Sequence, residues 1–96
     1  MNRLINIGFG NVVNSNRILG IISPNAAPIK RMVQMAKDGG TAIDATCGRK
    51  TKAVIVMDNG HLFLSALLPE TILHRVNSME DLDFLVTKQN NIIEGQ

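Results

Sequence analysis

The sequence predicts an α+β fold, a small and mostly antiparallel sheet with two or three helices in a single domain. A chain of 96 residues is long enough to bury only one hydrophobic core. Short stretches rich in β-branched residues recur along it, and a stretch with helical periodicity interrupts them at 26–38. One sheet with its helices on one side is the simplest way to bury these apolar faces, and we expect that arrangement.

The first predicted element is a strand at 4–8, where apolar and polar residues alternate. Glycines near its end predict a bulge or bend, and the two valines at 12–13 are expected to extend this strand toward the next turn. That turn is predicted at 14–16, because Asn and Ser side chains bond readily to their local backbone. A second strand is expected from Arg17 to Ser23, so that Arg17 starts a strand beside a tight turn.

The clearest helix is predicted at 26–38, because apolar residues recur there every three or four positions. These residues are Ile29, Met32, Val33 and Ala36. The side chain of Asn25 or Ser23 is expected to cap the first free amides of the helix. Gly39 and Gly40 follow its last turn and can supply the left-handed residue that ends a helix.

Three further strands are predicted in the middle of the chain, at 41–46, 53–57 and 62–67. The last two are joined by a strong turn signal, Asn59 followed by Gly60. These two residue types adopt positive φ most readily, so the pair predicts a type I′ hairpin.

The C-terminal part is expected to be helical. Pro69 opens a helix at 70–76, and a capping pattern predicts a further short helix at 79–86. The domain is expected to span residues 1–88, with 89–96 as a frayed C-terminal tail.

The net charge of +2 hides a strong asymmetry between the two halves of the chain. Residues 1–54 carry eight basic and two acidic side chains, a net charge of +6. Residues 55–96 carry two basic and six acidic side chains, a net charge of −4. Such a dipolar chain suits the binding of a polyanion, and it equally suits head-to-tail self-association.

The composition also indicates in which compartment of the cell the protein is found. Cys47 is the single cysteine, so no internal disulfide can form. The N-terminus does not read as a signal peptide, and the longest apolar run, 53–57, is far shorter than the roughly 18 residues that span a bilayer. We therefore expect a cytoplasmic protein that makes no membrane contact.

We expect no catalytic site, no metal and no cofactor, and therefore no enzyme. Cys47, His61 and His74 have no zinc-binding spacing, and we expect a half-buried thiol and two surface imidazoles. The glycine-rich segment 8–11 leads into a turn and not into a helix, so it does not match a dinucleotide fingerprint. The spacing of a phosphate-binding Walker loop is absent as well.

The remaining candidate site is a basic loop at 47–52, together with Arg17. Its cations and hydroxyl are typical of a loop that holds phosphodiesters, although a loop that only improves solubility has the same composition. No helix carries these cations beside Asn, Gln or aromatic residues, so selectivity for DNA would depend on backbone contacts and DNA shape. The loop contributes Arg49, Lys50, Thr51 and Lys52.

Seven strings in order over positions 4–76 resemble the RemA family, small bacterial regulators of biofilm matrix genes. They are Leu4-Ile5-Asn6-Ile7-Gly8-Phe9-Gly10-Asn11, Asn16-Arg17-Ile18, Ser23-Pro24, Ala27-Pro28-Ile29-Lys30-Arg31, Ile43-Asp44-Ala45-Thr46, Gly48-Arg49-Lys50-Thr51-Lys52-Ala53-Val54 and Pro69-Glu70-Thr71. The resemblance implies a DNA-binding transcriptional activator that lacks a helix-turn-helix motif. It also implies a ring-shaped homo-oligomer that presents basic residues to double-stranded DNA.

By this resemblance, Arg17 corresponds to a DNA-contacting arginine of the family, and Arg49 and Lys50 correspond to two consecutive arginines. Lys50 lacks the forked geometry of the arginine it replaces, and Cys47 stands where the family usually has an aromatic residue. A single copy neutralises about three phosphates and binds weakly, so we expect affinity to come from several linked copies.

Two other functions stay open at this point. An RNA-binding module would use the same charges, although the chain has no Trp or Tyr and only three Phe on which single-stranded bases could stack. An oligomeric scaffold that binds no nucleic acid would use the cations to pair with neighbouring subunits.

Overall fold

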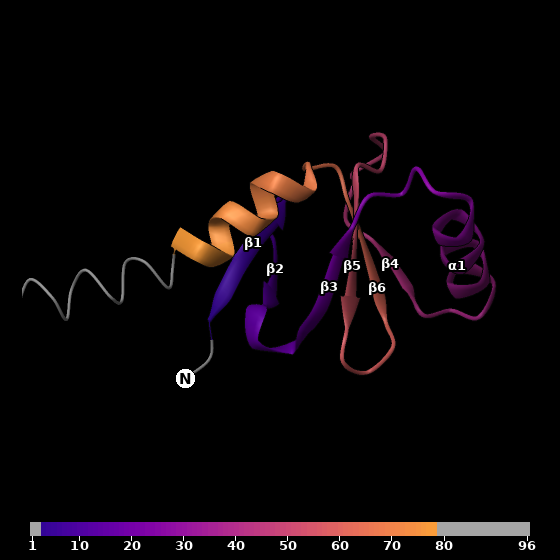
Figure 1. Cartoon of the computed structure of the whole chain (residues 1–96), viewed down its shortest axis with the longest axis horizontal. Coiled ribbons are helices and arrows are strands. Elements are labelled where there is room, and N and C mark those ends of the chain that lie inside the picture. The colour runs from indigo at the N-terminus through magenta and orange to yellow at the C-terminus, as the bar shows by residue number, and fades with distance from the viewer. Residues whose placement is uncertain (1–2, 79–96) are drawn as a thin grey trace, which may run out of the picture.

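Two separate sheets organise the chain, and not the single sheet that the sequence predicts (Figure 1). The computed structural model describes residues 3–78. The elements are β1 (Leu4–Gly8), β2 (Asn11–Asn14), a 3-10 helix (Ser15–Arg17), β3 (Ile18–Ile22), α1 (Ala27–Asp38), β4 (Ala42–Asp44), β5 (Ala53–Met57), β6 (Leu62–Ser65) and a helix at 69–78. The α+β class is confirmed. The predicted helix at 79–86 and the tail at 89–96 lie outside the described residues.

The first sheet is an antiparallel hairpin of β1 and β2. Its register shifts between Asn6 and Gly8, which confirms the predicted bulge. The chain reverses at Phe9 and Gly10, so the two valines belong to β2 and do not extend the first strand. The 3-10 helix that follows is capped by Asn14, whose side chain accepts a hydrogen bond from the Asn16 amide.

The second sheet has the strand order β3-β5-β6-β4. The pairs β3–β5 and β5–β6 are antiparallel, whereas β4 lies parallel to β6. Antiparallel pairing therefore dominates, as predicted. The turn between β5 and β6 differs from the expected type I′, because Gly60 has a φ of 86° while Asn59 stays outside the left-handed region. The Gly60 amide donates to the Met57 carbonyl at 3.0 Å, and the Met57 amide donates to the His61 carbonyl at 2.9 Å, which closes a three-residue loop at 58–60.

The second sheet buries both of its faces, because alternate residues of β5 point to opposite sides. Ala53, Ile55 and Met57 pack with the β1–β2 hairpin and with Ile72 of the helix at 69–78. Val54 packs on the other side with Ala36 of α1. The two helices thus cover opposite faces of this sheet (Figure 1), and the expectation that they share one side is wrong.

Helix α1 matches its prediction within one residue, but its N-terminus differs. Ala26 is the N-cap residue and makes no side-chain capping hydrogen bond, so neither Ser23 nor Asn25 has the expected role. At the other end, Gly39 keeps a helical conformation and Gly40 adopts the left-handed one, with a φ of 77°.

Candidate nucleic-acid interface

An acidic residue at the end of β4 fixes the turn that leads into the basic loop. The Asp44 carboxylate accepts hydrogen bonds from the backbone amide of Thr46 at 2.8 Å and from the Thr46 hydroxyl at 2.5 Å. These two bonds hold the pKa of the Asp44 carboxyl below its ordinary value, because they favour the ionised form. Thr46 is buried, so the pair anchors the loop to the edge of the second sheet.

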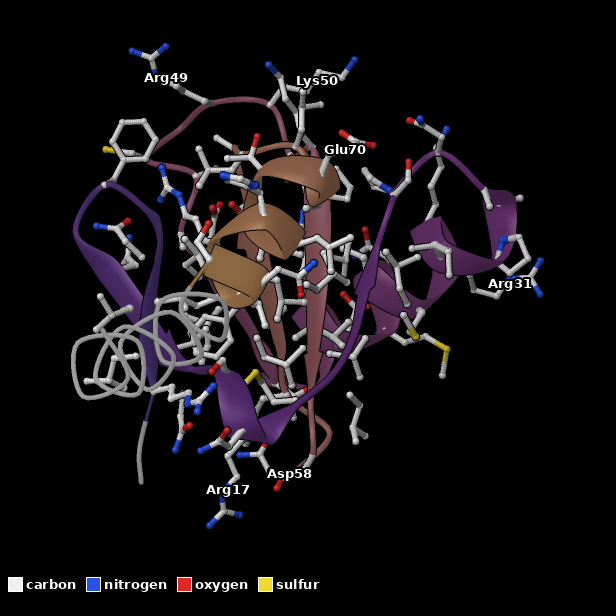
Figure 2. The ribbon with its side chains drawn as sticks, turned by 60° about the vertical axis from the view of Figure 1, so that its left-hand side comes forward. Arg17, Arg31, Arg49, Lys50, Asp58 and Glu70 are labelled. Carbon is white, nitrogen blue, oxygen red and sulfur yellow. The ribbon has the colours of Figure 1, made fainter. Side chains whose placement is uncertain are left out.

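A tight turn then lifts the cations away from the sheet. Cys47 and Gly48 have φ values of 55° and 81°, and the Arg49 amide donates to the Thr46 carbonyl at 3.0 Å. Cys47 is exposed, and not half-buried as predicted, because this left-handed turn faces solvent. Figure 2 shows the side chains of Arg49 and Lys50 extending outward from one end of the molecule.

The loop ends where it rejoins the sheet. The backbone amide of Lys52 donates to the Ser65 carbonyl at 2.8 Å, which places β5 beside β6. Thr51 is half-buried at this point, while the side chain of Lys52 is exposed. Four of the five predicted site residues therefore lie on one loop whose two ends are both fixed by hydrogen bonds.

An acidic residue that sequence reasoning missed lies at the edge of this loop. Glu70, in the first turn of the helix at 69–78, lines the same hollow as Lys50, Thr51 and Lys52 (Figure 2). The hollow has a volume of about 330 Å³. Although the loop itself contains no acid, Glu70 makes the electrostatic potential on this side of the loop less positive than the sequence suggests.

A second missed residue lies on the other side of the loop. The guanidinium carbon of Arg49 is 5.5 Å from the centre of the Phe9 ring, within the range of a cation–π contact. Phe9 is 52 % exposed and has a φ of 54°, a strained conformation that costs about 1–3 kcal/mol in a residue with a side chain. A hollow of about 510 Å³ adjoins them, lined by Phe9, Arg49, Lys50, Lys52, Ala66 and Leu67.

Arg17 is not part of this group. It ends the 3-10 helix one residue before β3 begins, and its Nη1 atom lies 3.0 Å from Oδ2 of Asp58. Asp58 directly follows β5 whereas the basic loop precedes it, so the two places are separated by about the length of a five-residue strand, roughly 15 Å. Figure 2 shows Arg17 and Asp58 at the end of the molecule opposite Arg49 and Lys50.

The histidines and acidic residues within 3–78 bear on other kinds of site. No three His, Cys, Asp or Glu side chains in this range come together as metal ligands would. His74 is exposed, whereas His61 is half-buried and its Nδ1 atom has no hydrogen-bond partner in the described part of the chain. None of the helices in this range has the length and apolar character required to cross a bilayer.

Comparisons with known proteins agree on one family. The sequence model of the RemA-like family, described as extracellular matrix regulatory protein A-like, matches residues 4–76. The extracellular matrix regulatory protein A of Bacillus subtilis is 56 % identical over 80 residues, which cover 83 % of this chain and 90 % of that protein. A relative from Lachnoclostridium phytofermentans is 65 % identical over 83 residues, which cover 86 % of this chain and 91 % of the relative.

Proposed function

Because the chain belongs to the RemA-like family of regulatory proteins, we propose that it regulates transcription by binding double-stranded DNA as a ring-shaped homo-oligomer. We further propose that it activates genes of the biofilm extracellular matrix and has no enzymatic activity. The observation that carries the proposal is the basic loop, which carries three cations on a hydrogen-bonded base and extends Arg49 and Lys50 outward from one end of the molecule.

The chemistry of these side chains suits the phosphate backbone. The Arg49 guanidinium can donate two parallel hydrogen bonds to one phosphate, whereas the ammonium groups of Lys50 and Lys52 act as mobile point charges. The Thr51 hydroxyl can add a neutral hydrogen bond. Contacts of this kind fix the position of the duplex without reading its bases, so DNA shape and flexibility would supply the sequence preference.

Self-association would raise the affinity for DNA above that of a single copy. Three loop cations in one copy neutralise about three phosphates and give a salt slope near −3, which corresponds to weak binding. A ring repeats the loop along a bent duplex, so each further copy adds contacts at a high effective concentration. The +6 and −4 halves of the sequence favour a head-to-tail contact between copies.

Arg17 would make a second and separate contact. Its distance from the loop prevents it from reaching the phosphate held by Arg49 of the same copy. We therefore propose that Arg17 contacts another part of the same duplex, and that the ring positions both ends of each copy against it.

The decisive experiment removes one guanidinium. Arg49→Ala should abolish binding to a labelled mixed-sequence duplex at moderate salt, while light scattering shows an unchanged oligomer. Arg31→Ala is the matched control, because Arg31 is an exposed arginine of α1 on a different side of the molecule (Figure 2). Unchanged binding by Arg49→Ala would contradict the proposal.

Two other outcomes would assign another function. If Arg49→Ala breaks the oligomer, the cations pair with neighbouring subunits and the protein is a scaffold. If single-stranded RNA displaces the duplex at equal concentration, the loop belongs to an RNA-binding module. Sedimentation that finds only single chains, with and without DNA, would exclude the ring.

A further inference from the structure

The tip of the β1–β2 hairpin has an unusual backbone. Gly8, Phe9 and Gly10 have consecutive φ values of 115°, 54° and 78°. Glycine adopts such values easily, but phenylalanine does not. Burial does not explain the choice of residue, because Phe9 is 52 % exposed. An aromatic side chain is thus held in a strained conformation on the surface, which is typical of a functional position.

Side-chain hydrogen bonds hold this tip in place. The side-chain amide of Asn11 donates hydrogen bonds to the backbone carbonyl of Gly8 at 2.9 Å and to that of Phe9 at 3.5 Å. The Asn6 side chain accepts a hydrogen bond from the Gly8 amide at 2.7 Å. The backbone that carries Phe9 is therefore held by the hairpin itself.

The guanidinium carbon of Arg49, forty positions away in the sequence, lies over the Phe9 ring at 5.5 Å from its centre. A guanidinium that stacks on a ring uses its flat face, so the N–H groups on its edge stay available. A free arginine side chain samples many rotamers, and ordering it upon binding lowers affinity. An arginine held over a ring by a cation–π contact has lost part of that freedom already.

We propose that Phe9 is a positioning residue for Arg49: its ring holds the guanidinium with the N–H edge directed outward, ready for a phosphate. This inference rests on the proposed function, because it concerns how Arg49 meets DNA. Lys50 and Lys52 line the same hollow as Phe9, yet the close cation–π contact is made by Arg49.

The first test uses duplex binding by Phe9 variants of the full chain. An exposed cation–π contact is worth about 0.5–1 kcal/mol, so Phe9→Leu should weaken binding about two- to fivefold per loop engaged. Phe9→Tyr keeps the aromatic face and should bind like the wild type. Phe9→Gly removes the strain as well as the ring, so it should bind weakly while its Tm stays equal or rises. A merely structural role would lower the Tm and the affinity together.

A double-mutant cycle shows whether Phe9 acts through Arg49. In an Arg49→Gln background, which has no cation to place over the ring, Phe9→Leu should have little further effect on duplex binding measured at low salt. An equal loss in both backgrounds would overturn the inference, because it would mean that Phe9 contacts DNA itself. The inference would also be overturned if the single variant Phe9→Leu bound DNA with wild-type affinity while the single variant Arg49→Ala bound it poorly.

A measurement on the free protein separates this inference from the proposed function. In the NMR spectrum, the Cδ protons of Arg49 should be shifted upfield by the Phe9 ring, and the shift should disappear in Phe9→Leu. If this shift is present but Arg49→Ala binds DNA normally, the proposed function fails while the contact itself stands. If the shift is absent, the positioning role fails whatever the DNA measurements show.

Discussion

The hydroxyl group of Ser65 on β6 donates a hydrogen bond of 2.7 Å to the backbone carbonyl of Ile7 on β1. Both residues are buried, and they belong to different sheets. The same hydroxyl oxygen accepts a hydrogen bond from the Leu67 amide at 3.0 Å. One side chain therefore connects the two sheets.

Ser65→Ala should lower the free energy of unfolding by about 1–3 kcal/mol, because it leaves the buried Ile7 carbonyl and the half-buried Leu67 amide without this partner. Urea denaturation followed by circular dichroism measures the change. Ser23→Ala is the control, since Ser23 is exposed. Equal midpoints for the two variants would contradict the role of the Ser65 hydrogen bonds.

Asp44→Asn should destabilise the protein in a pH-dependent manner. Hydrogen bonds from Thr46 lower the pKa of Asp44 in the folded state, so ionised Asp44 stabilises the fold above the ordinary pKa of 3.8. This contribution is lost as the pH falls through the lowered value. The stability difference between wild type and Asp44→Asn should therefore be constant from pH 7 to about pH 5 and shrink below about pH 4. A difference that stays constant down to pH 2 would refute this origin.

Glu70→Gln should strengthen DNA binding about two- to fivefold at low salt, because it removes a negative charge from the hollow shared with Lys50. The effect should decline as salt screens the charge. Fluorescence anisotropy with a labelled duplex measures it, and Asp38→Asn on α1 is the control for net charge. An equal gain in both variants would show that only the overall charge matters.

Asp58→Asn should leave stability nearly unchanged, within about 1 kcal/mol, because the Arg17–Asp58 pair is 65 % and 38 % exposed. It releases Arg17 from its ion pair, so DNA binding should become tighter if Arg17 touches phosphate. The added tightening should vanish in the double variant Asp58→Asn, Arg17→Ala. Persistent tightening there would mean that Arg17 makes no contact.

Local features of the fold could be predicted from the sequence, but the arrangement of its sheets could not. Helix α1 and the bulge at Gly8 depend on nearby residues, and both were predicted. The apolar run of β5 does not show that alternate residues enter two different cores. Which strand pairs with which is decided by contacts between distant segments, such as Ile7 with Ser65.

For the candidate site too, some residues could be predicted from the sequence and others could not. The cations of the basic loop are adjacent in sequence, so their charge pattern is visible without a structure. Phe9 is forty positions away from Arg49, and a glycine-flanked phenylalanine signals only a turn. Glu70 reaches the loop through the helix at 69–78, which no pattern within 47–52 can indicate.

The parallel pairing of β4 with β6 has a consequence for how the chain folds during synthesis. β4 leaves the ribosome well before β6, the strand with which it pairs in the described residues, and β3 likewise precedes β5. The nascent chain therefore carries unpaired strand edges until residue 65 has emerged. The β1–β2 hairpin alone can close early, so translation speed through β5 and β6 should govern how much nascent protein escapes aggregation.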